Sequence, residues 1–166
     1  MRPAREDERA LIEGLLQFYV YDFSELEPAA SDRFDFDAAG GYPPWDDLDD
    51  YWRRAGFHPL LILASGKTAG FALINTHSHR GGAIERNMGE FFIARKFRRG
   101  GVGTSAVAHI LAALPGIWEV AVAERNLAAK AFWPRAIAAA PGVSGLVRLE
   151  GDAGHWRGPI WRFTAI

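Results

Sequence analysis

A glycine-rich turn between a short apolar run and an Ala-rich segment constrains this chain more than any other feature. The apolar run at residues 91–94 predicts a strand, and residues 104–114 predict a helix. A turn from a strand into a helix aims unpaired backbone N–H groups, and the positive end of the helix dipole, at one point. Residues 100–103 read Gly-Gly-Val-Gly, which lets a ligand come close to the backbone. Arg98 and Arg99 add cationic donors, so the segment predicts a site for a phosphate or pyrophosphate.

The composition argues against several other classes of protein. The 166 residues suffice for one domain, which we expect to span residues 1–166. A net charge of −1 argues against a nucleic-acid or membrane-surface partner, because such proteins usually carry a basic excess. The chain has no cysteine, which excludes disulfides, thiol nucleophiles and thiolate metal sites. The sequence opens with no apolar leader and contains no stretch long enough to cross a bilayer, so we expect a cytoplasmic protein.

The remaining elements follow from periodicity and from turn residues. We expect helices at residues 6–21, near 22–26 after a turn, from 45–52, at 104–114, and at 127–139 with a break or bend at Pro134. We expect strands at residues 60–64, 69–75, 91–94, 117–123, 143–150 and 159–166. The glycines and prolines of residues 28–44 predict a loop. This order favours a mixed α/β sheet with helices covering both faces.

The glycine turn also fits a second class of protein. Residues 101–106 match the loose pattern G-x-G-x-x-A, and Glu124 follows about twenty residues later, where dinucleotide-binding folds place an acid for the ribose. A dinucleotide-binding oxidoreductase therefore stays open as an alternative. We rank it lower because residues 95–99 separate the strand from the glycines, and because the chain after Glu124 is too short for the remaining strand–helix units.

Three segments of the chain, taken in order, resemble one family. Residues 98–103, Arg-Arg-Gly-Gly-Val-Gly, resemble the R/Q-x-x-G-x-G/A signature of the GNAT acetyltransferase superfamily. Residues 126–133, Asn-Leu-Ala-Ala-Lys-Ala-Phe-Trp, resemble the N-x-x-A-x-x-F/L-Y segment that follows the next strand in that family. Residues 2–8 resemble a frequent opening in which a first strand runs into the first helix. Residues 21–25, Tyr-Asp-Phe-Ser-Glu, resemble a segment of one predicted acetyltransferase subgroup.

The resemblance implies a fold and a cosubstrate. The fold would be a GNAT-like α/β fold, with a mixed, mostly antiparallel central sheet that is splayed at the middle and has helices on both faces. The cosubstrate would be acetyl-CoA or a related acyl-CoA, with no metal. Its pantetheine arm would pair with the strand at residues 91–93, its thioester would lie in the gap before the next strand, and its pyrophosphate would lie on the amides of residues 99–104. The residues implied in cofactor binding are Phe91, Phe92, Ile93, Arg98, Arg99, Gly100, Gly101, Val102, Gly103, Thr104, Asn126, Ala129 and Trp133.

The implied reaction moves an acetyl group to a primary amine that attacks the thioester directly. A backbone N–H at Phe92 or Ile93 would stabilise the oxyanion, and a base must remove a proton from the amine. Glu90 is the first catalytic candidate, since strand alternation places it among apolar neighbours that raise a carboxyl pKa. A strand-end glutamate paired with an arginine explains Glu90 equally well. Glu119 on the next strand is the second candidate.

One position departs from the family's pattern and leaves a further alternative open. Many members carry a tyrosine that protonates the leaving thiolate where this chain has Trp133. An indole N–H donates a hydrogen bond but does not titrate usefully. Either water or another group protonates the thiolate, or the thiolate leaves unassisted, or the protein is a non-catalytic acyl-CoA-binding sensor module.

The acceptor cannot be identified from these residues beyond a small-molecule or peptide amine. The candidates for the acceptor pocket are Tyr21, Tyr51 and Trp52, together with Trp45 and Tyr19, because the family commonly builds that pocket from the first two helices and their loop. Core packing is the other interpretation of these rings. His77 and His79 have a metal-like spacing but no evident third ligand, so we predict no metal site. A homodimer is left open.

Overall fold

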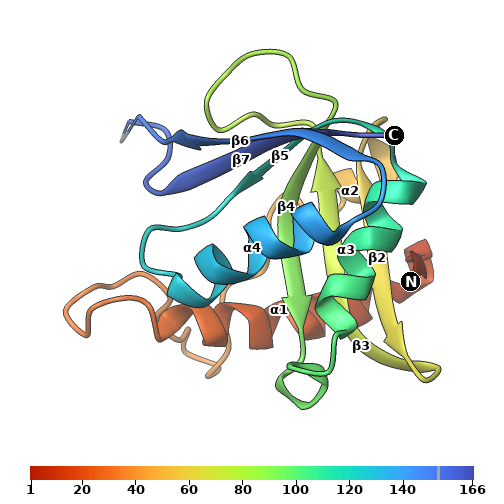
Figure 1. The fold of residues 1–166 in the computed structure, drawn as a ribbon. Helices are drawn as coiled ribbons and strands as arrows, with labels where there is room; N and C mark the ends of the chain where they lie inside the picture. The colour runs from red at the N-terminus through yellow and green to blue at the C-terminus, as the bar shows by residue number, and fades with distance from the viewer. Residues whose placement is uncertain (153) are drawn as a thin grey trace.

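A computed structural model of the chain describes residues 1–152 and 154–166, and in it one sheet of seven strands organises the fold (Figure 1). The spatial order of the strands is β1-β2-β3-β4-β5-β7-β6. In chain order the strands are β1 (Arg2–Pro3), β2 (His58–Ala64), β3 (Lys67–Asn75), β4 (Arg86–Ile93), β5 (Gly116–Ala121), β6 (Val143–Glu150) and β7 (Pro159–Ala165). The helices are α1 (Arg9–Ser24), α2 (Asp50–Arg53), α3 (Val102–Ala113) and α4 (Leu127–Ala139), with short 3-10 turns η1 (Glu6–Glu8) and η2 (Arg95–Phe97).

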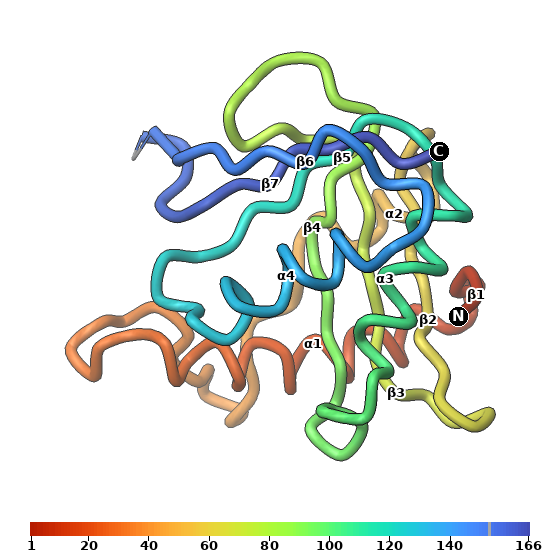
Figure 2. Tube along the Cα trace, viewed as in Figure 1, coloured from red at the N-terminus to blue at the C-terminus, as the bar shows by residue number. Residues whose placement is uncertain are grey.

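The sheet opens between β4 and β5. Within the described residues these two strands form the one parallel pair, and they pair only at Arg86 with Trp118 and at Asn87 with Glu119. Beyond Asn87 the two strands diverge, and Figures 1 and 2 show β4 running away from β5. The other neighbouring strands pair antiparallel. The prediction of a mostly antiparallel sheet splayed at its middle is confirmed, and a parallel dinucleotide-binding sheet is excluded.

Helices cover both faces of the sheet, as predicted. One buried cluster joins α3 and α4 to side chains that alternate along the strands, such as Ile62 and Ile74. A second cluster joins α1 and α2 to the intervening strand residues, such as Leu61 and Leu73. Phe92 belongs to the second cluster, whereas Phe91 packs against the first. Successive residues of β4 therefore face different helix layers, which is the period-two alternation of a strand.

Three local expectations differ from the structure. The helix expected near residues 22–26 is absent, because α1 itself continues to Ser24 and two turn hydrogen bonds follow it. The helix expected from residue 45 begins only at Asp50, after a stretch of turns. Pro134 neither breaks α4 nor ends it. A proline removes one hydrogen bond from a helix and adds some strain. The packing of Trp133 and Ala136, on either side of Pro134 in the chain, holds α4 against the core and compensates for this.

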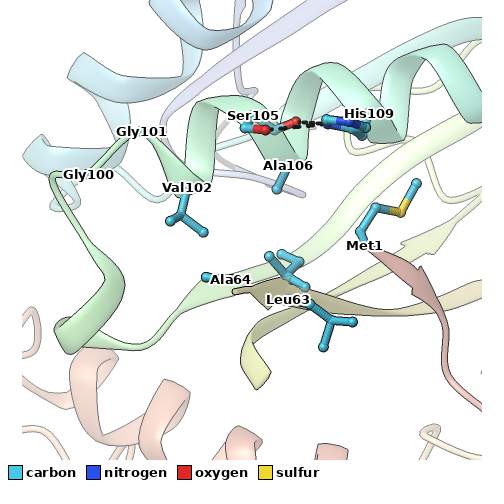
Figure 3. Close-up of a pocket in the computed structure, with 10 residues that line it drawn as sticks. Met1, Leu63, Ala64, Gly100, Gly101, Val102, Ser105, Ala106 and His109 are labelled. Atoms are coloured by element: carbon cyan, nitrogen blue, oxygen red, sulfur yellow. Dashed lines mark hydrogen bonds between the residues drawn. The ribbon is translucent and has the colours of Figure 1, made fainter. Parts of the chain in front are cut away.

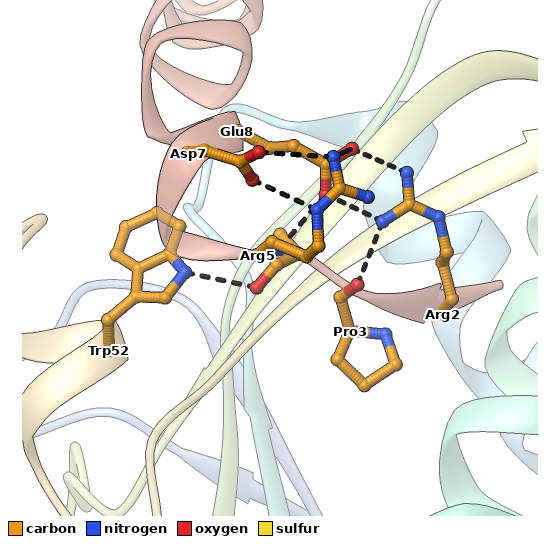
Figure 4. Close-up of polar contacts among 7 residues, drawn as sticks. Arg2, Pro3, Arg5, Asp7, Glu8 and Trp52 are labelled. Atoms are coloured by element: carbon orange, nitrogen blue, oxygen red, sulfur yellow. Dashed lines mark hydrogen bonds and ion pairs between the residues drawn. The ribbon is translucent and has the colours of Figure 1, made fainter.

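The first residues of the chain are fixed by a cluster of polar contacts (Figure 4). Arg2 donates to both carboxylate oxygens of Glu8, at 2.6 and 2.5 Å, and Arg5 donates to Asp7 at 2.9 Å. The indole N–H of Trp52 donates to the carbonyl of Ala4 at 3.0 Å. These contacts attach β1 and the start of α1 to α2. None of the described helices is long and apolar enough to span a bilayer.

Candidate active site

The loop between η2 and α3 presents a row of unpaired backbone amides. Among the described residues, the N–H groups of residues 99–104 donate no hydrogen bond within the protein. The amide of Ser105 is the first to close a helical turn, donating to the carbonyl of Gly101 at 2.9 Å. Arg99 and Gly101 have positive φ angles of 64° and 80°, which bend the chain between η2 and the first turn of α3. We call residues 99–104 the amide cradle; it has the geometry of an anion site.

The glycines of the amide cradle differ in the space around them. A Cβ on Gly100 or Gly101 would meet no atom within 4 Å, so nothing in the protein itself occupies this side of the backbone. A Cβ on Gly103 would lie 3.3 Å from the ring of Phe132 on α4. Gly103 therefore lets α3 and α4 pack closely, while Gly101 allows the left-handed turn and leaves room for a ligand.

A hollow of about 370 Å³ lies beside the amide cradle, on the β2 side of α3 (Figure 3). Its walls include Leu63 and Ala64 of β2, Gly100, and Ser105 and His109 of α3. The ring of His109 bonds to the carbonyl of Ser105 at 2.7 Å, so one of its nitrogens is already engaged. No residue of β4, β5 or α4 contributes to this hollow, which is therefore separate from the opening between β4 and β5.

Arg95, the first residue of η2, and Arg98, which follows η2, are directed toward α1. Arg98 donates from Nε to the carbonyl of Ile93 at 2.6 Å, and its guanidinium pairs with Asp22 of α1. Arg95 pairs with the same carboxylate at 2.7 Å. Arg99 is exposed and belongs to the amide cradle itself. Of the arginines expected to assist a phosphate, Arg98 is thus engaged in fixing the end of β4, and Arg99 stands beside the cradle without a partner among the described residues.

The edge of β4 facing the opening offers backbone groups for pairing. The amide of Ala94 donates to Ala69 of β3 at 2.8 Å, which directs Ala94 toward β3. Since the N–H groups along a strand alternate in direction, Phe92 also points toward β3, and Ile93 and Phe91 point toward β5. The N–H groups of Ile93 and Phe91 are therefore available on the open edge of β4, whereas the N–H of Phe92, one of the two expected oxyanion donors, is directed toward β3. In this part of the chain β5 pairs with β7 and leaves that edge of β4 unpaired.

Side chains of α4 pack over β4 on the α3 side. The ring of Phe91 lies 5.1 Å from the indole of Trp133 and 6.0 Å from the ring of Phe132. Trp133 is 6% exposed and belongs to the buried core. Asn126 caps α4, since its side chain accepts a hydrogen bond from the amide of Ala129 at 2.9 Å. Trp133 is thus close to the predicted thioester position on β4, whereas the side chain of Asn126 is occupied by its helix.

Glu90 lies on the opposite face of β4, beneath α1. Its Oε2 accepts a hydrogen bond from the hydroxyl of Tyr19, so its partner is a tyrosine and not one of the arginines. Burial raises the pKa of Glu90 to about 7, and the hydrogen bond from Tyr19 acts in the opposite direction. Burial, followed by the Glu90 charge and hydrogen bond, raises the pKa of Tyr19 well above its ordinary value. Glu90 can therefore exchange a proton near neutral pH, and Tyr19 keeps its own.

A chain of buried amides continues from this site toward the point where β4 and β5 part. Asn75 donates to the hydroxyl of Tyr51 at 3.1 Å, and Asn87 donates to Asn75 at 2.9 Å. A Cβ on Gly89 would lie 2.6 Å from Asn75 and 3.1 Å from the Tyr51 hydroxyl, so only glycine fits this bulge of β4. Burial raises the pKa of Tyr51 to about 12. The predicted acceptor residue Tyr51 thus lies beside Glu90 in the core under α1 and α2.

Glu119 is buried in a different setting. It is fully inaccessible, and its oxygens accept hydrogen bonds from Arg162 at 2.8 Å, from Ser78 at 2.9 Å and from the amide of His79 at 2.6 Å. Arg162 also donates to the carbonyl of Gly81 at 2.9 Å. The pair joins the loop at residues 76–85 to β5 and β7. A buried carboxylate paired with a guanidinium and held by two further donors stabilises the fold.

The other predicted residues lie apart from Glu90. Tyr21 is 54% exposed and lines a second hollow with Phe18 and Phe36, on the outer side of α1. The indole N–H of Trp52 donates to the carbonyl of Ala4. His77 packs on Phe57, and His79 packs on Trp156. Among the described residues no group of three or more potential metal ligands comes together.

The sequence did not predict three sets of contacts in the site. Asp22 anchors Arg95 and Arg98, Tyr19 binds Glu90, and Asn75 joins Tyr51 to Asn87. Asn75 left a signal, because an amide at the end of an apolar strand needs a buried partner. Nothing in the sequence indicates the contact of Tyr19 with Glu90, because the two residues are 71 positions apart and the helical spacing of Tyr19 is that of a core residue.

Comparisons with known proteins agree with this geometry. Residues 21–137 match the family model described as the acetyltransferase (GNAT) family. No curated protein matches the sequence.

Several solved structures share the fold at low sequence identity. An acetyltransferase from Thermus thermophilus has a TM-score of 0.63 at 15% identity, over 99% of this chain and 95% of its own. A ribosomal-protein-alanine N-acetyltransferase from Brucella melitensis has a TM-score of 0.54 at 16% identity, over 99% and 98%. An aminoglycoside 6′-N-acetyltransferase complexed with coenzyme A has a TM-score of 0.56 at 9% identity, over 96% and 91%.

Proposed function

This chain belongs to the acetyltransferase (GNAT) family, and we propose that it moves an acetyl group from acetyl-CoA to a primary amine by direct attack on the thioester. The observation that carries the proposal is the amide cradle beside the opening between β4 and β5. An anionic diphosphate matches the unpaired N–H groups at the N-terminus of α3, and the extended pantetheine arm matches the free edge of β4. The coenzyme A held by the aminoglycoside 6′-N-acetyltransferase of similar fold supports the same cosubstrate.

In this proposal the two substrates approach from opposite faces of the sheet. The cofactor lies on the α3 and α4 side, where Trp133 and Phe91 pack, and the acceptor enters on the α1 and α2 side, where Glu90 and Tyr51 lie. The opening between β4 and β5 lets them meet. The amine nitrogen bonds to the thioester carbon as its proton passes to Glu90, directly or through water. The N–H of Ile93 stabilises the oxyanion until the C–S bond breaks.

The acceptor is a small-molecule or peptide amine in this proposal, and the protein acts in the cytoplasm. The described residues near Glu90 supply aromatic walls and one carboxylate, and this suits an amine that arrives with an apolar or aromatic stem. The absence of cysteine from the chain suits a reducing compartment.

The test follows free-thiol release from acetyl-CoA with a panel of amines, together with calorimetric titration of coenzyme A. We expect coenzyme A to bind and at least one amine to accelerate thiol release. Binding without release for any amine would support the acyl-CoA sensor instead. A melting temperature raised by NAD(P) and not by coenzyme A would refute the assignment of the cradle.

A further inference from the structure

We propose that Tyr19 is a positioning residue for acetyl transfer: its hydroxyl holds Oε2 of Glu90 and leaves Oε1 to receive the proton of the acceptor amine. The inference rests on the proposed function, in which Glu90 is the base. Among the described residues Tyr19 is the hydrogen-bond partner of Oε2, and Oε1 has none. A carboxylate fixed through one oxygen presents the other in a defined direction.

The position of the Tyr19 hydroxyl is itself fixed by packing. The tyrosine ring lies within 4.7 to 6.3 Å, between ring centroids, of four other aromatic rings, those of Phe23, Trp45, Phe71 and Phe92. These rings come from α1, from the segment before α2, and from β3 and β4. Aromatic pairs in such tilted and edge-to-face arrangements stabilise one orientation of the ring. The packed ring therefore holds the Tyr19 hydroxyl in one place against Oε2 of Glu90.

Among the described residues, Tyr19 is the main polar group that influences the orientation and the pKa of Glu90. Tyr51 from α2 is the other titratable group near Glu90; its hydroxyl accepts a hydrogen bond from Asn75, and among the described residues it makes no hydrogen bond to Glu90. The residue opposite Glu90 on β3 is Leu73, which carries no charge. Arg98 lies 5.6 Å from the ring centroid of Phe92 and is paired with Asp22. On the same face of the sheet Glu119 is already paired with Arg162.

Removing the Tyr19 hydroxyl should change Glu90 in a predictable direction. A hydrogen bond to a carboxylate favours its charged form, so Tyr19→Phe raises the pKa of Glu90 above the value of about 7 that it has now. A base works only when it is deprotonated, so the acid limb of the pH profile moves to higher pH in the variant. The carboxylate is also no longer held through one oxygen, so part of the rate is lost at every pH. The phenylalanine ring keeps the aromatic packing, and the fold is retained.

The first experiment measures kcat/KM against pH for the native protein, Tyr19→Phe and the control Tyr42→Phe. The hydrogen bonds of Tyr42 to Gln17 are made by its backbone, so this control removes a tyrosine hydroxyl without breaking any of them. We expect Tyr19→Phe to move the acid limb upward by about one pH unit, with a loss of at least roughly ten-fold below pH 6, of which only part is recovered above pH 9 because Oε1 is no longer held in one direction. Tyr42→Phe keeps the native profile. An unmoved limb, or a complete recovery at high pH, would overturn the proposal.

The second experiment needs no acetyl transfer. The carboxyl carbon of Glu90 is titrated by NMR in protein labelled with ¹³C-glutamate, and Glu90→Gln assigns the signal. We expect the midpoint to rise in Tyr19→Phe and to stay in place in Tyr42→Phe. An unchanged midpoint in Tyr19→Phe refutes the role of Tyr19, while failure of every amine in the thiol assay refutes the proposed function and leaves this titration valid.

Discussion

Replacing Gly101 by valine tests the amide cradle directly. Gly101 has a φ of 80°, and a Cβ at this position would meet no protein atom within 4 Å. The substitution therefore costs the folded protein only the strain of a left-handed residue, which is about 1–2 kcal/mol. For a chain of this size that strain lowers the melting temperature by roughly 2–8 °C. A ligand lying on the amides meets the new side chain, and the protein alone does not.

The loss of affinity can be estimated from the bonds that the cradle offers. A hydrogen bond to a charged group contributes about 1.5–3 kcal/mol. If the valine displaces the diphosphate from two of the six amides between residues 99 and 104, binding weakens by about 3 kcal/mol or more, which is a factor of at least about 100 in Kd. Isothermal titration with coenzyme A measures the change, and a thermal melt measures the strain in the same sample.

Gly66 provides the matched control for this experiment. It lies in the turn between β2 and β3, has a φ of 75°, and also has open space where a Cβ would be. Gly66→Val should lower the melting temperature about as much as Gly101→Val but leave the Kd for coenzyme A unchanged. Equal Kd values for both variants and the native protein would refute the cradle. Gly103→Val is a poor probe, because its Cβ would contact Phe132 and disturb the packing of α3 on α4.

Two further predictions concern Glu90 and Glu119. Glu90→Gln should lower kcat at pH 7 by about 10²–10⁴ and leave the Kd for coenzyme A unchanged, as steady-state kinetics and calorimetry would report; a native kcat would exclude Glu90 as the base. Arg162→Met leaves Glu119 buried without its cation and should lower the free energy of unfolding in urea by about 3 kcal/mol. Arg148→Met removes an exposed pair with Glu150 and should cost less than about 1 kcal/mol, so equal losses would contradict the assigned role of the buried pair.

Local features of the sequence were sufficient to predict the strand, the glycine turn and the helix that form the amide cradle. The glycines, the strand before them and the helix after them are contiguous, so residues 91–114 could be interpreted without long-range contacts. The splay between β4 and β5 was implied by family resemblance and is present in the register. Strand alternation also placed Glu90 and Phe92 on one face correctly. Features governed by backbone geometry and periodicity are those that a sequence reveals.

The acceptor side could not be predicted in the same way. The partner of Glu90 is Tyr19, and the partner of Glu119 is Arg162, each on an element that is distant in sequence. Both glutamates lie on strands with similar alternation of apolar residues. Glu119 nevertheless pairs with a guanidinium, and among the described residues Glu90 pairs with none. The pKa of each glutamate depends on what packs over it, and that packing is known only once the sheet order and the helix positions are known.

Trp133 leads to a last prediction, about the alkaline side of the pH profile. The indole cannot give a proton to the leaving thiolate, and Trp133 is packed against Phe91 and Phe132 in the core. Burial raises the pKa of Tyr51 to about 12, so it stays protonated across the working range. A thiol with a pKa near about 8.5 is a fair leaving group as its anion. We therefore expect kcat/KM to rise through about pH 7 as Glu90 deprotonates and then to stay level to pH 10, without the falling limb that a titrating acid imposes. A bell-shaped profile in stopped-flow thiol release would contradict unassisted departure and require an acid other than Trp133.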